Sequence, residues 1–387
     1  MGSDGGWQTE AVERLGITVP IVGAPMGGGP STPALVAAVS EAGGLGSLAG
    51  GYLSPDRLRS DIAAVRAATS KPFAVNLFVP SPAEPRPEEI QAALAALEPF
   101  RMELGLPARP NPTGPWAEDF DAQLAVLIEE RVPVTSFTFG LLPAPAVAAL
   151  HEAGSILVGT ATTVEEAAAV EASGADLVCA QGSEAGAHRG TFLADDGPGP
   201  GPAPGRPGAS GGAGRAPSPE QSLVGTLALV PQVCDAVGIP VLAAGGIMDG
   251  RGVAAVLGLG AGAAQLGTAF LRCPEAGTPA PHRRALAAAG DTSTTVTAAI
   301  TGRAARGIEN RLMLALRDVD GPPYPVMHVL TSELRRAAAQ RDDPDLMSLW
   351  CGQGVRLATE LPAADLVRRL AADAAAAIDR LAKLAGR

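Results

Sequence analysis

The chain has 387 residues, of which 47% are hydrophobic and 18% charged, so it holds enough apolar material for a large core and is not a wholly disordered protein. Its formal net charge of −11 and its 3% of aromatic residues argue against a nucleic-acid groove and against binding to anionic membranes. The four cysteines are scattered, and neither a signal peptide nor a membrane-spanning stretch is visible. The sequence has no C-x-x-C motif, and these features together predict a cytoplasmic protein without a disulfide framework.

Short, continuously apolar runs alternate with Ala-rich helical segments, a pattern typical of parallel strands covered by helices. The predicted strands are Ile21–Met26, Leu45–Ala49, Phe73–Phe78, Val134–Phe139, Ile156–Ala161, Asp176–Gln181, Val241–Ala244 and Ala263–Thr268. The predicted helices between them include Thr32–Ala42 (with Ser31 as its N-cap), Pro55–Thr69, Pro143–Ala153 and Val164–Ser173. Eight strand–helix units in about 300 residues predict an α/β fold, a (β/α)8 TIM barrel rather than an open doubly wound sheet.

Two insertions interrupt the alternation. The first lies near residues 80–120 and contains a helix around Glu88–Leu104. The second, near residues 197–219, is composed almost entirely of Gly, Pro and Ala, and is either a tolerated surface insertion or a mobile flap over the active site. We predict a barrel core over residues 1–277 and a mainly helical region over residues 278–387 that packs on the barrel or covers its mouth.

One of the four histidines is a candidate catalytic residue. His188 follows the sixth predicted strand in the small-residue segment AQGSEAGAHRG, and catalytic groups of barrels lie in the loops after the strands. A neutral imidazole is well suited to accept a proton near pH 7. A structural role for His188 is about equally compatible with its position alone, and we favour structural roles for His151, His282 and His328.

Glycines end the last two predicted strands, as Gly245-Gly246 and as Gly267 before Thr268. Consecutive glycine turns of this kind form the usual phosphate site of a barrel, because bare backbone N–H groups bind the anion. For one pair alone a tight turn is the favoured interpretation, whereas two pairs on consecutive strands favour a ligand site. The chain has neither a convincing dinucleotide fingerprint nor a Walker A motif, which favours a mononucleotide.

Several motifs resemble, in order, those of the nitronate monooxygenase family, formerly called 2-nitropropane dioxygenases. The resemblance is carried by PIVGAPMGGGPSTPALVAAVSEAGGLGSLAGG, FAVNLFVP, VTSFTFG, AQGSEAGAHRG, PVLAAGGIMDGRGVAAVLGLGAGAAQLGTAF, ITGRAARGIENRL and SLWCGQG. It covers almost the whole chain outside the two insertions. The chain departs from the family pattern at Ala187, where glycine is commoner, and in the Gly/Pro insertion, both of which lie close to His188.

The resemblance implies an FMN-containing barrel with a small additional helical domain, and it implies roles for individual residues. His188 matches the catalytic base. The cofactor-binding positions are Ala24, Pro25 and Met26 against the flavin, Asn76 and Gln181 as polar contacts, Gly186 as a backbone contact, and Gly246, Gln265, Leu266, Gly267 and Thr268 around the phosphate, to which the glycine turns add Gly245. Trp350 and Gln353 either close the substrate side or dock a helix. No metal ligands are expected.

The function implied by this resemblance is oxidation of alkyl nitronates, and of nitroalkanes, by O₂ to a carbonyl compound and nitrite. The alternatives are a flavin-dependent enoyl reductase that uses NAD(P)H and, less favoured, a non-catalytic flavin-binding protein. The expected partners are a small nitronate or nitroalkane and O₂, with no nucleic acid and no membrane, and a homodimer is compatible with the sequence. The physiological nitro compound stays open.

Overall fold

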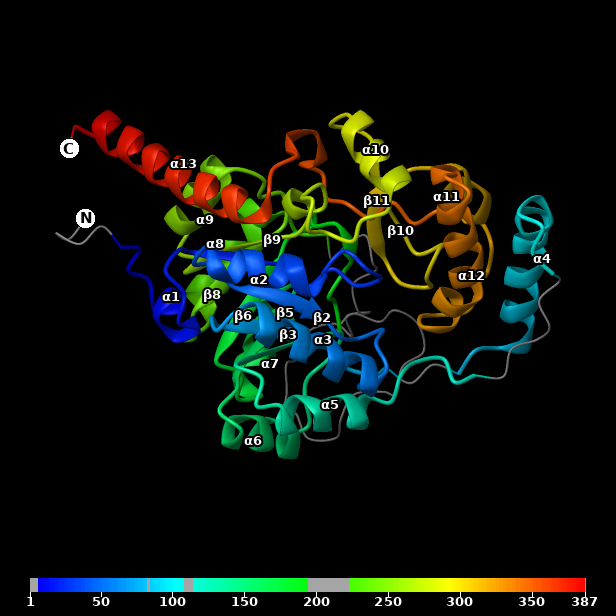
Figure 1. Ribbon diagram of the computed structural model, residues 1–387, viewed down its shortest axis with the longest axis horizontal. Helices are drawn as coiled ribbons and strands as arrows, with labels where there is room; N and C mark the ends of the chain where they lie inside the picture. Colours follow the sequence, from blue (N-terminus) through cyan, green and yellow to red (C-terminus); the bar gives the residue numbers. More distant parts are fainter. Residues whose placement is uncertain (1–5, 82–83, 108–113, 194–222, 387) are drawn as a thin grey trace, which may run out of the picture.

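The computed structural model describes residues 6–81, 84–107, 114–193 and 223–386. Its centre is an eight-stranded parallel sheet in the order β1-β9-β8-β6-β5-β4-β3-β2 (Figure 1). The strands are β1 (Ile21–Gly23), β2 (Gly46–Ala49), β3 (Phe73–Phe78), β4 (Val134–Thr138), β5 (Ile156–Ala161), β6 (Leu177–Gln181), β8 (Val241–Ala244) and β9 (Ala263–Leu266). The predicted insertion at residues 197–219 lies outside the described residues.

The sheet closes on itself where its two edges meet. Val22 of β1 bridges to Leu45, and Gly23 N–H donates to the Leu45 carbonyl at 2.8 Å. All neighbouring pairs are parallel, and helices cover the outside, the last of them being α13 from the end of the chain. The predicted (β/α)8 barrel is therefore confirmed.

Helices surround the barrel because their apolar faces are buried against the outward-facing side chains of the strands. The covering helices are α2 (Pro33–Glu41), α3 (Pro55–Ala68), α5 (Phe120–Glu129), α6 (Ala144–Glu152), α7 (Val164–Ala172), α8 (Thr226–Ala236), α9 (Gly250–Gly258) and α13 (Ala363–Leu384). The predicted N-cap of α2 is wrong by one residue. Thr32 caps this helix by accepting from Leu35 N–H, since the Ser31 hydroxyl is bonded to Met26 N–H.

The amino-terminal end of the barrel is closed by a short helix, α1 (Glu10–Leu15). Its buried residues Ala11, Val12 and Leu15 join a cluster formed by the first inward-facing side chains of the strands, among them Val22 and Leu177. Side chains two positions further along each strand point inward again, toward the carboxyl end. The site described below is built on that opposite end.

A second unit lies beyond the carboxyl ends of the strands, on the right of Figure 1. It contains a small antiparallel sheet in the order β10-β11-β7, with β7 at Ala187–His188, β10 at Thr294–Thr297 and β11 at Ala305–Ile308. Its helices are α4 (Pro87–Glu103), α10 (Ala280–Ala288), α11 (Arg311–Leu316) and α12 (Val326–Gln340), and short 3₁₀ turns follow at Thr268–Phe270, Pro344–Leu346 and Val355–Leu357. The three strands of the small sheet were not predicted.

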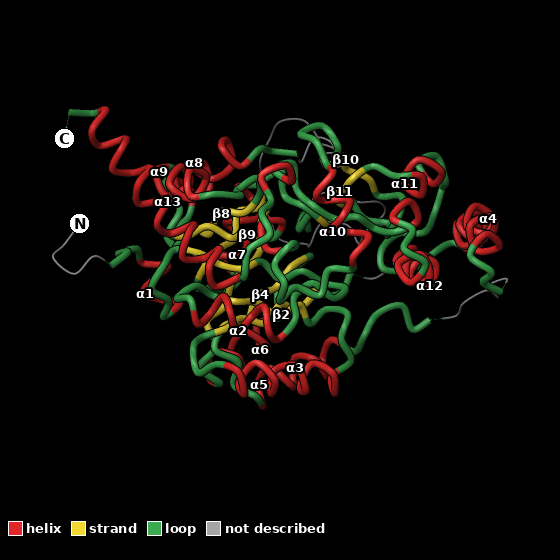
Figure 2. Tube along the Cα trace, turned by 45° about the horizontal axis from the view of Figure 1, so that its top comes forward, coloured by secondary structure: helices red, strands yellow, loops and turns green. Residues whose placement is uncertain are grey.

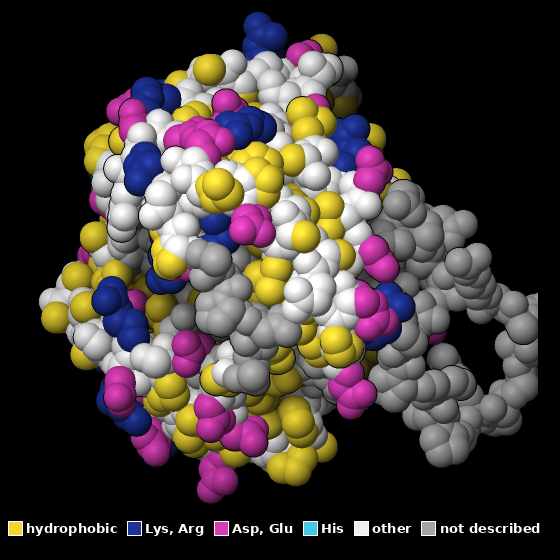
Figure 3. All heavy atoms as spheres, turned by 90° about the vertical axis from the view of Figure 1, so that its right-hand side faces the viewer, with side chains coloured by type: hydrophobic (Ala, Val, Ile, Leu, Met, Phe, Trp, Pro, Cys, Tyr) yellow, Lys and Arg dark blue, Asp and Glu magenta, His cyan; other side chains and the backbone are white. Residues whose placement is uncertain are grey.

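Helix α4, which comes from the first insertion, packs against α12 near the other end of the chain (Figure 2). The two helices share an apolar core of their own, which includes Leu97, Leu330 and Leu334. On the outer face of this unit, acidic and basic side chains are interspersed with hydrophobic ones (Figure 3). The predicted division at residue 277 stays a prediction, and α13 at the end of the chain lies back against α9 and α2 of the barrel.

Candidate active site

The glycines after β8 and β9 form a bare stretch of backbone at the carboxyl end of the barrel. Gly245 and Gly246 both adopt positive φ, +113° and +71°, and a Cβ atom on Gly245 would lie 3.0 Å from the Gly182 carbonyl oxygen. No acceptor among the described residues takes the N–H groups of Gly246, Gly267 or Thr268. The N-terminus of α9 is already capped by the Asp249 carboxylate, so an anion here would be held by the loop N–H groups.

The predicted polar residues share the inner face of the barrel. Asn76 lies two positions beyond Ala74, and Gln265 two beyond Ala263, both of which belong to the inner cluster at the closed end. Asn76 Nδ2 donates to Ser136 Oγ at 3.0 Å and to Thr138 Oγ1 at 3.2 Å. Gln265 Nε2 lies 3.3 Å from Cys179 Sγ. The pairs Asn76–Ser136 and Gln265–Cys179 thus form part of a polar floor below the loops.

Gln181 holds the segment that carries the candidate base. Its Nε2 donates to the His188 carbonyl oxygen at 3.1 Å, and its Oε1 accepts from Gly190 N–H at 2.8 Å. His188 itself lies on β7, which pairs with β11 in the register Ala305↔His188. Both ends of the Gln181 amide therefore fix the backbone around His188.

The residue before His188 has an unusual backbone conformation. Ala187 has φ +59°, in the left-handed region that favours glycine. This explains in physical terms why glycine suits the position where the chain departs from the family pattern. The strain lies one residue from the candidate base, where β7 pairs with Arg306 of β11.

In the His188 ring, Nε2 is hydrogen-bonded to the protein and Nδ1 has no partner among the described residues. Nε2 lies 2.9 Å from Thr301 Oγ1, and that fully buried hydroxyl donates to the Arg303 carbonyl oxygen at 3.2 Å. Because Thr301 has a single hydroxyl proton, we assign the Nε2–H of His188 as donor to Thr301. Nδ1 then carries a free lone pair, and it has no hydrogen-bond partner among the described residues.

Burial, followed by the positive charges of Arg303 and Arg335, lowers the pKa of His188 to about 3. The Arg303 guanidinium lies 4.1 Å from the centre of the Phe139 ring and donates from Nε to the Arg189 carbonyl oxygen at 3.2 Å. The imidazole is thus neutral at pH 7 and able to accept a proton or a hydrogen bond at Nδ1.

Three aromatic rings contact His188 and connect to two more. We call this group, made of Tyr52, Phe78, Phe139, Tyr324 and Trp350, the aromatic wall. The ring centres of Tyr324, Phe139 and Trp350 lie 5.4, 5.8 and 6.0 Å from that of His188. Phe139 also has a positive φ, +78°, which is rare for a bulky residue outside a functional or strained site.

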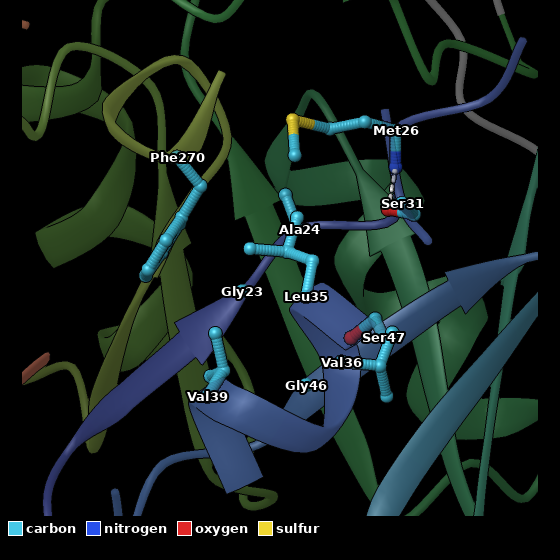
Figure 4. Close-up of a pocket in the computed structure, with 10 residues that line it drawn as sticks. All are labelled: Gly23, Ala24, Met26, Ser31, Leu35, Val36, Val39, Gly46, Ser47 and Phe270. Atoms are coloured by element: carbon cyan, nitrogen blue, oxygen red, sulfur yellow. Dashed lines mark hydrogen bonds between the residues drawn. The ribbon is translucent and has the colours of Figure 1, made fainter. Parts of the chain in front are cut away.

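The first-strand segment Ala24-Pro25-Met26 bends away from the barrel directly after β1 and is partly exposed. Figure 4 shows the small pocket behind it, between this segment, α2 and Phe270, with Met26 N–H donating to Ser31 Oγ at 2.9 Å. Its volume of about 10 Å³ is about the space of one water molecule. This pocket is too small for a flavin or a substrate.

The segment SLWCGQG closes the site from the end of the chain. Gly352 N–H donates to Thr268 Oγ1 at 2.8 Å, and Gln353 N–H donates to the Glu184 carbonyl oxygen at 2.9 Å. A Cβ atom on Gly186 would lie 2.6 Å from Gly352 N, so the two backbones touch. Gly352, Gly186 and Thr268, which are far apart in the sequence, are therefore brought together.

Thr301, Tyr324 and His328 also contribute to the site and were missed by sequence reasoning as site residues. Thr301 lies inside ITGRAARGIENRL, which carries the family resemblance, so the motif was a usable signal. Tyr324 and His328 lie in a segment with no motif, and nothing in their spacing points to His188.

The site has the form of a (β/α)8-barrel enzyme, with its polar groups at the carboxyl ends of the strands. The nitronate monooxygenase family matches residues 10–373, and the chain belongs to this family of flavin-dependent oxidoreductases. In the described part of the chain no helix is long and apolar enough to cross a membrane. Nor does that part contain a group of three His, Cys, Asp or Glu side chains suited to a metal ion.

Individual relatives cover nearly the whole chain. A probable nitronate monooxygenase of Staphylococcus aureus (strain MSSA476) is 41% identical over 360 residues, 92% of this chain and 95% of the relative. The structure of nitroalkane oxidase from Streptomyces ansochromogenes is 43% identical, with a TM-score of 0.83, over 96% of this chain and 100% of that chain. FabK from Thermotoga maritima is 29% identical, with a TM-score of 0.73, over 97% and 99%.

Proposed function

We propose that this protein uses FMN and O₂ to oxidise alkyl nitronates, and more slowly neutral nitroalkanes, to a carbonyl compound and nitrite. The observation that carries the proposal is His188, a neutral imidazole whose Nε2 is tied to Thr301 and whose Nδ1 is open beside the aromatic wall. The family and the similarity to a nitroalkane oxidase support nitro compounds as the substrate class.

The residues present fit a flavin mononucleotide. The N–H groups of Gly246, Gly267 and Thr268 would hold its single phosphate, while Asn76, Gln181 and Gln265 supply polar groups around the ring and Ala24 to Met26 an apolar backbone edge. Neither lysine lies near this phosphate position, because Lys71 precedes β3 at the closed end of the barrel and Lys383 lies at the end of α13. When bound, the flavin supplies the electron acceptor, and the protein supplies position and electrostatics.

The low pKa of His188 supports the proposed preference for nitronates over neutral nitroalkanes. A base with a pKa of about 3 is a poor acceptor for the proton of a carbon acid. The nitronate anion formed by that proton transfer would lie beside the imidazolium and raise the pKa of His188 again. A nitronate is already deprotonated when it binds, so no proton has to be transferred to Nδ1. The charges of Arg303 and Arg335, which disfavour the imidazolium, favour an anion in the same space.

The test is nitrite release from ethyl nitronate in air by the purified protein, with the cofactor released by heat and identified by chromatography. We expect FMN, not FAD, and nitrite formation that depends on oxygen. Anaerobic mixing with NADH is the matched control, because rapid flavin reduction by NADH without nitrite formation would establish an enoyl-reductase type of reaction instead. A flavin-loaded protein that does neither would be a binding protein.

A further inference from the structure

A second histidine packs against the same aromatic wall as His188, because both contact Tyr324. His328, in the first turn of α12, stacks on Tyr52 with ring centres 4.4 Å apart and planes 3° apart. Tyr52 lies after β2, and its hydroxyl oxygen is 3.4 Å from that of Tyr324, which in turn contacts His188. The aromatic wall therefore runs without a break from one histidine to the other.

Arg335 fixes the tautomer of His328. Arg335, two turns further along α12, approaches His328 Nδ1 with Nη2 at 3.3 Å. A guanidinium group has donors and no acceptor, so Nδ1 must carry a lone pair and the ring proton must lie on Nε2. That Nε2–H has no hydrogen-bond partner among the described residues, and the side chain is only partly buried, which leaves the donor open to a ligand.

Arg335 also brings a positive charge that nothing nearby neutralises. Its N–H groups are taken by Thr331 Oγ1, Ser348 Oγ and the His328 carbonyl oxygen, all uncharged. No carboxylate in the described ranges lies within ion-pair distance of it. A partly buried cation without a counter-charge favours an anionic ligand, and burial together with Arg335 lowers the pKa of His328 to about 2, so the ring donates without becoming charged.

We propose that His328 is a substrate-binding residue that donates its Nε2–H to an anionic oxygen of the substrate, and that Arg335 is the positioning residue that fixes this donor. The inference rests on the proposed function for the identity of the substrate. His188 and His328 carry their protons on the same nitrogen, but the ring nitrogens that lack a partner among the described residues differ. His188 offers the Nδ1 lone pair, and His328 offers the Nε2 proton.

The first test compares three variants of the flavin-loaded enzyme. His328→Phe keeps a ring on Tyr52 and removes both nitrogens, Arg335→Met removes the positioning charge, and Arg336→Met removes the neighbouring exposed charge as a matched control. We expect His328→Phe to raise KM for nitronates by about ten- to a hundredfold, the range for a hydrogen bond to a charged group, with a much smaller change in kcat. Arg335→Met should raise KM in the same direction, and Arg336→Met should not.

Two probes separate the possible anionic oxygens. If KM rises for both ethyl nitronate and propionate 3-nitronate, His328 binds the nitro oxygens; if it rises only for propionate 3-nitronate, His328 binds the carboxylate. Unchanged KM for both substrates in folded, flavin-loaded His328→Phe would overturn the proposal.

The second test does not depend on turnover. Binding of nitrate, an unreactive planar anion, is followed through the flavin absorption band, and the tautomer of each histidine is read by ¹⁵N NMR of the wild-type enzyme. We expect nitrate to bind at least about tenfold more weakly to His328→Phe, and His328 to carry its proton on Nε2. A proton on Nδ1 of His328 would overturn the proposal even if the variants failed to fold, whereas a wild-type enzyme that released no nitrite would count against the proposed function alone.

Discussion

At the scale of single residues, the candidate site depends on hydroxyl and amide groups that hold His188 from two directions. Gln181 fixes the backbone on one side of the ring, and Thr301 fixes the proton on Nε2. Replacing the base and replacing its partner should therefore have different effects.

The variant His188→Asn keeps polarity and removes the titratable base. A positioned base contributes about 10²–10⁴-fold, so we expect a loss of that order on a neutral nitroalkane and a clearly smaller loss on a preformed nitronate. The measurement is nitrite release from both substrates by protein with a verified flavin content. An equal loss on both would make His188 a binding residue and require a different base.

Thr301 offers a closely matched pair of variants. Thr301→Val keeps the shape of this fully buried side chain and removes its hydroxyl, whereas Thr301→Ser keeps the hydroxyl. We expect Thr301→Val to lower kcat on a nitroalkane by roughly three- to tenfold, the value of one neutral hydrogen bond, and Thr301→Ser to restore most of it. If the serine variant were as slow as the valine variant, packing and not the hydroxyl would be the cause.

The positive φ of Ala187 predicts that replacing this residue with glycine stabilises the protein. Because its φ is +59°, Ala187→Gly should raise the free energy of unfolding by about 0.5–1 kcal/mol, measured by urea denaturation of the flavin-loaded protein. The matched control is Ala185→Gly in the same loop, whose φ is not positive and which should lose a similar amount. A loss in both variants would show that β7 tolerates alanine without strain.

At the scale of elements, the barrel strands could be predicted and the small sheet could not. The amino ends of the strands were predicted to within one residue, and the carboxyl ends of β2, β3, β5, β6 and β8 were predicted correctly. The predictions for β1, β4 and β9 ran past the observed ends, in β1 and β9 because the chain leaves the sheet there and enters the loops of the site. β7, β10 and β11 have only two to four residues and no apolar period. The pairing of β7 with β11 joins segments more than a hundred residues apart, which a local sequence pattern does not report.

The same contrast holds within the site. Asn76 and Gln265 were predicted as site residues from the family resemblance, and in the structure they lie two positions beyond Ala74 and Ala263 of the inner cluster. The contact between His188 and Thr301 crosses 113 residues and has no period to reveal it. The predicted flavin contacts of Asn76, Gln181 and Gln265 stay predictions.

Helix α1 closes the end of the barrel that carries no chemistry, so it should affect stability and not catalysis. Leu15 is 1% exposed, and Leu15→Ala should lower the free energy of unfolding by about 2–5 kcal/mol while the folded enzyme keeps its kcat. Glu13→Ala, on the exposed face of the same helix, is the control and should change stability by less than about 0.5 kcal/mol. A large fall in kcat for folded Leu15→Ala would contradict this separation of the two ends.

At the scale of the whole molecule, three histidines make the fold sensitive to acid. Burial is the main cause that lowers the pKa of His188 to about 3, of His282 to about 4 and of His328 to about 2. The unfolded chain binds these protons near pH 6.5, whereas the folded chain binds them only near or below pH 4. Stability that is complete above pH 6.5 is therefore lost as the pH falls.

Each histidine contributes a slope of up to about 1.4 kcal/mol per pH unit between its unfolded and folded pKa values. We expect the free energy of unfolding to fall steeply from pH 6 to pH 4, and His282→Phe to reduce that slope by about a third of the histidine contribution. Urea denaturation at a series of pH values measures both. A slope unchanged in His282→Phe would mean that His282 titrates normally in the folded protein.

The pairing of β7 with β11 has a consequence for protein synthesis. A ribosome makes the chain from the amino end, so the barrel strands through β9 emerge before Ala305 to Ile308 exist to receive β7. Until then His188 lacks both its strand neighbour and the hydroxyl that sets its proton. All eight barrel strands are therefore synthesised before the partners of His188, and the enzyme becomes competent to turn over substrate only when nearly all of the chain has been made.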